Sequence, residues 1–200
     1  MGVYTIKSIG PLILFHLVFF RKFYFQNPFI YATSEPLDTA FPSSQLLGRC
    51  LRETKRISDP YYYPHYSSIP FLSAYYPVLR LQAWIGSFLS VDSAFRLYSF
   101  TMVLHFLFSS IGAYLLFSQF GPLLAFFGAI TFGYMGYAIK QNSCINYTLP
   151  WIPWVFWGAD IHSPIITGIS LGMMMLAGYW PIGIYIWPLT GLYWLTRSVS

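Results

Sequence analysis

The sequence is organised around one apolar run, "LYSFTMVLHFLFSSIGAYLLF", which extends from Leu97 to Phe117. This run contains no charged residue and is as long as the roughly 20 residues that a helix needs to cross the hydrocarbon core of a bilayer. In the whole chain, hydrophobic residues make up 56%, aromatic residues 22% and charged residues 8%, and the mean hydropathy is +0.53. Since an ordinary soluble domain carries about 25% charge, we expect an all-α integral membrane protein.

Further apolar runs lie on both sides of this one and predict about six transmembrane helices. Lys7 and Arg21-Lys22 flank the first run, and no small-residue cleavage site follows it, so we expect an uncleaved span and not a signal peptide. Pro150 and Pro153 interrupt the fourth run and predict a kinked or partial span. The predicted spans, within a single membrane domain of residues 1–200, are residues 5–25, 97–117, 121–139, 149–161, 164–179 and 182–195.

Charged residues are concentrated between the first two predicted spans, in residues 26–92. Both glutamates lie there, and four of the eleven basic residues fall in "SSQLLGRCLRETKRI", residues 43–57. Leu46, Leu47 and Leu51 fall on one face of a helix and the basic residues elsewhere, which predicts a basic amphipathic helix in the headgroup plane. We therefore expect a long first extracytoplasmic loop, residues 26–92, that carries interfacial helices.

Several short motifs follow one another in a recognisable order. They are "DTAFP" from Asp38, "DPYYYPHYSSIPF" from Asp59, the run from Leu97, "AFFGAITFGYMGY" from Ala125, "LPWIPW" from Leu149 and "LAGYWPIGIYIWPLTGLYWL" from Leu176. This order resembles that of the YfhO-like bacterial membrane proteins, which belong to the GT-C class of glycosyltransferases. The chain departs from the pattern at Ser67-Ser68, where a glycine-rich approach is usual, and at Tyr179, where a histidine is frequent. Members of that family are several times longer, so we expect this chain to represent their N-terminal module.

The resemblance implies a catalytic acid in the first extracytoplasmic loop. In GT-C enzymes such an acid is the general base that takes a proton from an acceptor hydroxyl while a sugar leaves its polyprenyl-phosphate carrier with inversion. Asp38 occupies the matching place, and Glu35 is the reserve candidate. A carboxylate partly desolvated at a membrane interface is suited to accept a proton, because desolvation disfavours its charged form. Without the resemblance, a turn cap or an ion pair with a nearby arginine is the simpler explanation of Asp38.

Other polar residues receive narrower roles. Asp59 is a second candidate acid, although Asp-Pro is common in turns, and His65 is a candidate proton-transfer group. Within the predicted spans, His105 and Asp160 are candidate functional residues because ionisable groups are costly in a bilayer, and Asp160 falls near a helix end. The basic residues of the amphipathic helix are expected to bind the phosphate of the lipid carrier, with plain contact to anionic lipid as the alternative; they are Arg49, Arg52, Lys55 and Arg56.

The sequence therefore predicts a membrane glycosyltransferase, or its N-terminal module, that transfers a sugar from a polyprenyl-phosphate carrier to a cell-envelope glycopolymer or lipid acceptor. The expected partners are the bilayer, the lipid-linked sugar donor and a further membrane segment or subunit that completes the fold. No nucleic acid and no cofactor are expected, and Cys50 and Cys144 share no metal-ligand spacing.

We place the protein in the cytoplasmic membrane with its N-terminus in the cytoplasm. The positive-inside rule supports this only through Lys7 and Arg197, because Arg21-Lys22 and the basic residues of the loop favour the reverse. Two other functions remain open. One is a transporter or channel element, for which His105 and Asp160 would be the evidence. The other is an inactive, truncated accessory membrane protein.

Overall fold

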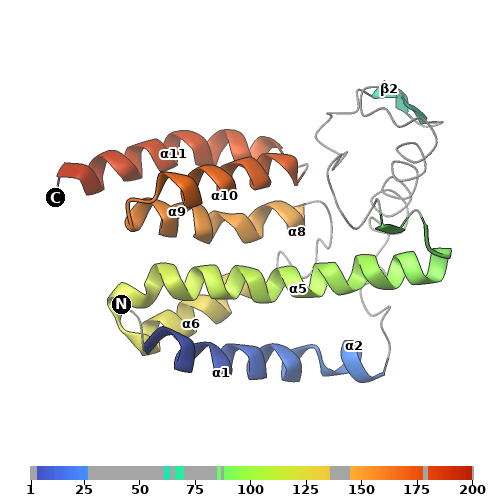
Figure 1. Ribbon diagram of the computed structural model, residues 1–200, viewed down its shortest axis with the longest axis horizontal. Coiled ribbons are helices and arrows are strands. Elements are labelled where there is room, and N and C mark those ends of the chain that lie inside the picture. Colours follow the sequence, from blue (N-terminus) through green and yellow to red (C-terminus); the bar gives the residue numbers. More distant parts are fainter. Residues whose placement is uncertain are drawn as a thin grey trace.

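The computed structural model describes residues 4–26, 61–63, 66–69, 85–86, 88–135, 145–177 and 180–199. These residues are almost entirely helical (Figure 1), which confirms the predicted helical class. The exception is a short antiparallel ladder of β1 (Tyr61–Tyr63) and β2 (Tyr66–Ile69), with Tyr61 opposite Ile69 and Tyr63 opposite Tyr66. It lies in the segment for which we predicted interfacial helices and a turn at Asp59, and tyrosine has a high preference for strands.

A helix covers at least part of each of the six predicted spans. In chain order the elements are α1 (Tyr4–Phe19), α2 (Arg21–Phe25), α5 (Val91–Phe117), the 3-10 turn η2 (Ser118–Phe120), α6 (Pro122–Gly133), α8 (Ile145–Thr148), the 3-10 turn η3 (Leu149–Trp151), α9 (Ile152–Asp160), α10 (Pro164–Leu176) and α11 (Trp180–Val199).

Within the described residues, one helix is long and apolar enough to cross a membrane by length and composition. This helix is Val91–Phe120, which joins α5 to η2 and contains a window with a mean hydropathy of 1.8. Shorter apolar helices are Ile9–Phe19, Pro122–Gly133 and Pro164–Met175. At about 1.5 Å per residue, the 12 residues of α6 extend only about 18 Å, so the number of spans stays a prediction.

The helices run alternately in opposite directions (Figure 1). α1 leads away from the end at which the N-terminus lies, α5 returns to it, and α6, α9, α10 and α11 continue the alternation. The C-terminus consequently lies at the same end as the N-terminus. The end of α2 and the start of α5 lie together at the opposite end, so the predicted loop leaves and rejoins the bundle on one side.

Local capping explains where the helices begin. α5 starts at Val91 rather than at the predicted Leu97, because the Ser90 side chain accepts a hydrogen bond of 3.3 Å from the backbone N–H of Ser93. The prediction of a span from Leu97 rests on hydropathy alone. Gly121, at φ 101°, separates η2 from α6 in a conformation that favours glycine. Pro122 then occupies the first turn of α6, where its missing N–H leaves no bond unmade.

The interior of the bundle combines large apolar side chains, such as Met102, Phe106 and Met174, with small and hydroxyl-bearing ones. α5 lies in the middle and packs against α1, α6 and α9. At its contact with α9, the indole N–H of Trp154 donates to the carbonyl of Phe108 at 3.0 Å, and the two rings stack with centroids 4.8 Å apart. Buried small and hydroxyl-bearing residues are Ala94, Ser99, Ser109, Ser110, Ala113, Ala125, Ala129, Thr148, Ala159, Thr167, Ser170 and Thr190.

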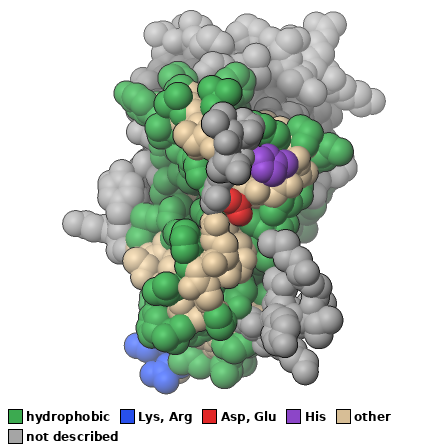
Figure 2. Space-filling model, turned by 90° about the vertical axis from the view of Figure 1, so that its left-hand side faces the viewer, with side chains coloured by type: hydrophobic (Ala, Val, Ile, Leu, Met, Phe, Trp, Pro, Cys, Tyr) green, Lys and Arg blue, Asp and Glu red, His purple; other side chains and the backbone are tan. Residues whose placement is uncertain are grey.

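Many other large apolar side chains point outward. Figure 2 shows the end of the bundle at which the termini lie, and hydrophobic side chains cover most of its described surface. A soluble monomer rarely exposes apolar surface of this extent. Exposed examples are Leu14 and Val18 on α1, Leu123, Leu124 and Phe127 on α6, Ile165 and Ile169 on α10, and Ile184, Trp187, Leu192 and Leu195 on α11.

Candidate functional site

The residues predicted to carry the chemistry are Glu35, Asp38, Arg49, Arg52, Lys55, Arg56, Asp59 and His65, and they lie outside the described residues. Of the segment that contains them, the structure describes the two ends and the short ladder of β1 and β2. Gln26 follows α2, and Val91 begins α5, at the same end of the bundle (Figure 1). The candidate polar side chains that the structure does describe lie within the bundle.

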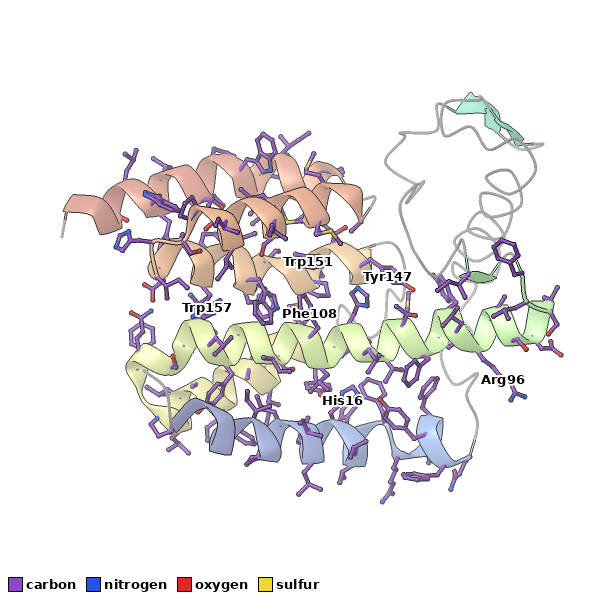
Figure 3. The ribbon with its side chains drawn as sticks, in the orientation of Figure 1. His16, Arg96, Phe108, Tyr147, Trp151 and Trp157 are labelled. Carbon is purple, nitrogen blue, oxygen red and sulfur yellow. The ribbon has the colours of Figure 1, made fainter. Side chains whose placement is uncertain are left out.

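His16 is the most buried ionisable side chain among the described residues, with 1% of its surface exposed. It lies on α1, and its two ring nitrogens are both engaged. Nδ1 lies 2.8 Å from the hydroxyl of Tyr134, and Nε2 lies 2.9 Å from the hydroxyl of Tyr24. Tyr134 directly follows α6 and Tyr24 belongs to α2, so one imidazole connects three elements (Figure 3).

An aromatic shell surrounds this imidazole. Tyr134 lies against Phe15 and Phe19, each with a centroid distance of 5.0 Å, and the ring of Phe20 lies 4.8 Å from that of His16. On the α5 side, Phe106 stacks on Tyr134 at 6.2 Å. Such a shell excludes water, and a polar group without water must find its hydrogen bonds within the protein.

The directions of these hydrogen bonds depend on the tautomer of His16. In a neutral imidazole one ring nitrogen donates and the other accepts, so one of the two tyrosine hydroxyls accepts from His16 and the other donates to it. On α5, Ser110 donates its hydroxyl proton to the carbonyl of Phe106 at 3.0 Å.

His105, the first intramembrane candidate from the sequence, lies in the middle of α5. Its Nδ1 donates to the carbonyl of Thr101, one turn earlier in the same helix, at 2.7 Å. Its ring meets that of Tyr147 edge to face at 4.8 Å (Figure 3). A cavity of about 10 Å³ lies beside it, lined by residues that include Ser109 and Gly133, which is about the room that one water molecule needs.

Asp160, the second intramembrane candidate, is the last residue of α9, as the sequence suggested for a position near a helix end. It is half-buried, and its Oδ1 accepts a hydrogen bond of 3.2 Å from the hydroxyl of Tyr193 on α11. It lies at the end of the bundle opposite to the predicted loop (Figure 1). The structure therefore does not bring Asp160 together with His16 or His105.

Sequence reasoning did not single out His16, because a lone histidine in an apolar run resembles any other core position. Its partner Tyr134 is 118 positions away in the chain, so no local spacing reveals the contact. Among the residues that the structure describes, no group of three or more histidine, cysteine or acidic side chains could hold a metal ion. The chain matches no protein-family model, no curated protein and no solved structure.

Proposed function

We propose that this chain is a multi-pass membrane protein of the cytoplasmic membrane whose bundle holds residues 26–92 at one membrane surface. In that loop a sugar is transferred from a polyprenyl-phosphate carrier to a cell-envelope acceptor. The observation that supports the membrane part is the extent of the outer apolar surface, together with the small and hydroxyl-bearing groups that lie among the buried side chains. Membrane helices associate in this way, because lipid is as apolar as leucine and close backbone contact decides their packing.

Glycines at helix contacts give further support. A Cβ built on Gly112 of α5 would lie 2.5 Å from the indole nitrogen of Trp154, and one built on Gly158 of α9 would lie 2.8 Å from the backbone nitrogen of Thr167. The contact at Gly158 brings two helix backbones close together, which is typical of transmembrane interfaces that contain small residues. We therefore favour six passes, including α6 and α10, which are shorter than the hydrocarbon thickness.

The resemblance to GT-C enzymes and the placement of the loop support the transfer reaction. The loop is joined to the bundle by Gln26 and Val91 at a single end, so a lipid-borne phosphate and an aqueous acceptor can both reach it. In the proposed step the carboxylate of Asp38 accepts the proton of an acceptor hydroxyl. The hydroxyl oxygen bonds to the anomeric carbon, and the bond from that carbon to the phosphate oxygen breaks with its electron pair on the departing polyprenyl phosphate.

The polar groups inside the bundle support this function over a transporter. Nδ1–H of His105 donates to a carbonyl of its own helix, and both ring nitrogens of His16 are hydrogen-bonded to tyrosine hydroxyls. Transporters, in contrast, bind their substrates at polar midplane sites formed by broken helices. Asp160 lies at a helix end and not at the midplane.

Labelling with a membrane-impermeant maleimide tests the topology in a background from which Cys50 and Cys144 are removed. Gln26→Cys and Gln119→Cys stand at opposite ends of the bundle, and Leu124→Cys is on an apolar outer face. We expect intact spheroplasts to label only Gln26→Cys, permeabilised cells to label Gln119→Cys as well, and neither to label Leu124→Cys. Labelling of all three positions in intact cells would exclude the membrane-spanning bundle. Labelling of Gln119→Cys but not Gln26→Cys in intact cells would show that the protein has the opposite orientation in the membrane.

Transfer from a purified lipid-linked sugar tests the chemistry. Asp38→Asn keeps the shape of the side chain and removes its basicity, so we expect the rate to fall by about 10² to 10⁴, the typical contribution of a general base. Glu53→Gln, at an acid with no predicted role, serves as the control within the same loop. If Glu35→Gln is the inactive variant, the base is Glu35; if neither change lowers the rate, the loop does not carry the reaction.

A further inference from the structure

We infer that His16 is a positioning residue: through its two tyrosine partners it fixes α2 on the bundle, and with α2 the point at which the predicted loop begins. The positioning rests on the membrane part of the proposed function, and its catalytic consequence rests on the proposed transfer reaction. Tyr24 stands two positions before Gln26, the last described residue ahead of the loop. The hydrogen bond between Tyr24 and His16 is thus the last side-chain hydrogen bond described before the chain enters the loop.

The geometry of α1 and α2 makes this attachment necessary. The two helices are separated at Phe20, whose φ of −95° and ψ of 19° leave the helical range. His16 and Tyr24 are eight residues apart, about 12 Å along a straight helix, yet their ring centroids lie only 5.9 Å apart, so the two side chains reach toward one another across the break. The hydrogen bond of 2.9 Å therefore closes across the break and holds the short second helix in line.

Apolar contacts alone would hold α2 only loosely. Phe23 is buried against Val103 and Phe106 of α5, and Tyr24 meets Phe100 edge to face at 6.4 Å. In lipid, however, an apolar side chain that leaves the protein finds an equally apolar environment, so such contacts contribute packing but little hydrophobic driving force. A buried hydrogen bond differs, because its loss leaves an unpaired polar group in a site without water.

Spin-label distances test the positioning without any substrate. One label pair, Gln26→Cys with Asp92→Cys, reports where α2 lies relative to α5, and a second pair, Leu123→Cys with Ile169→Cys, reports the rest of the bundle. All four positions are exposed, and both native cysteines are replaced. Tyr24→Phe and His16→Phe keep the ring and remove the hydrogen bond. The control is Tyr185→Phe on the exposed face of α11.

We expect Tyr24→Phe and His16→Phe to broaden the first distance distribution and shift it to longer values, with the population of detached α2 raised about tenfold or more. The second distribution and the Tyr185→Phe control should not change. His16→Gln, which offers one donor and one acceptor, should restore part of the narrow distribution. An unchanged first distribution overturns the inference, and so does broadening of both pairs, because His16 would then stabilise the whole bundle and not the position of α2.

Transfer assays separate this inference from the proposed function. If both hold, Tyr24→Phe lowers kcat with little effect on KM, because the donor still binds while the base is misplaced. If the wild-type protein has no transferase activity but the distances respond as expected, the proposed function fails and the positioning role of His16 stands. If activity is present and Tyr24→Phe leaves both kcat and the distances unchanged, the positioning role fails alone.

Discussion

The close approach of α9 to α10 at Gly158 predicts a large effect from the addition of one methyl group. A Cβ at Gly158 would lie 2.8 Å from both the backbone nitrogen and Oγ1 of Thr167, and 3.0 Å from Cγ2 of Ile166. Non-bonded heavy atoms prefer about 3.5–4.0 Å, so in Gly158→Ala the two helices must separate by about 0.7 Å or more. A backbone nitrogen cannot rotate away as a side chain does. Overpacking of this kind costs about 1–3 kcal/mol.

Gly168→Ala on α10 is the matched control. Gly168 is exposed, and a Cβ there would meet nothing within 4 Å. Alanine is favoured over glycine in a helix by about 0.5–1 kcal/mol, so this substitution should leave the free energy of unfolding unchanged or raise it. The two alanine variants, ten positions apart in the chain, are therefore expected to change stability in opposite directions.

Unfolding in mixed micelles of a mild detergent and dodecyl sulfate, followed by tryptophan fluorescence, measures both free energies. Trp151, Trp154 and Trp157 report directly, because they lie along η3 and α9, where Phe108 of α5 contacts Trp151 and Trp154 (Figure 3). If Gly158→Ala and Gly168→Ala agree to within about 0.5 kcal/mol, the usual range for neutral surface changes, α9 and α10 do not approach as closely as described.

Two further predictions use the same chain. Trp154→Phe removes the N–H that donates to Phe108 and should lower the free energy of unfolding by about 1 kcal/mol. Trp157→Phe should be neutral or stabilising, because the buried indole nitrogen of Trp157 has no partner among the described residues. Equal losses of free energy in the micelle titration would contradict this prediction. The second prediction concerns the basic residues of the predicted loop, and the substitutions are glutamate at Arg49, Arg52, Lys55 and Arg56. They should weaken binding of a polyprenyl phosphate in a vesicle assay, with a neutral polyprenol as the control. Undiminished binding would show that these residues do not bind the phosphate.

Helix positions were predictable from the sequence because apolar runs and their breakers are local signals. Gly121-Pro122 and Ser163-Pro164 separate neighbouring helices, and a helix begins directly after each pair's first residue. The start of α5 was placed too late, because the first turns of that helix carry Asp92 and Arg96, and polar residues there conceal a boundary that is set by the cap Ser90. Hydropathy identifies the apolar part of a helix and not its hydrogen-bonded beginning.

The interior contacts could not be predicted in the same way, since they join residues that only the fold brings together. The hydroxyl of Tyr147 reaches the carbonyl of Tyr98 across 49 positions at 3.4 Å, and Trp154 reaches Phe108 across 46. The sequence singled out His105 by residue type alone. It could not show that a carbonyl of the same helix already accepts from His105, which makes this histidine a weaker candidate for transport.

The position of His16 and its partners Tyr24 and Tyr134 follows from the short length of α6. This helix ends at Gly133, which packs against Ser110 and Phe106 near the middle of α5. A helix that ends inside the bundle leaves its last carbonyls without partners in the helix, so other groups must satisfy them. Tyr134, the first residue after α6, is the residue whose hydroxyl is hydrogen-bonded to His16. The end of α6 and the attachment of α2 are thus linked through one imidazole, and a longer α6 would move Tyr134 away from His16.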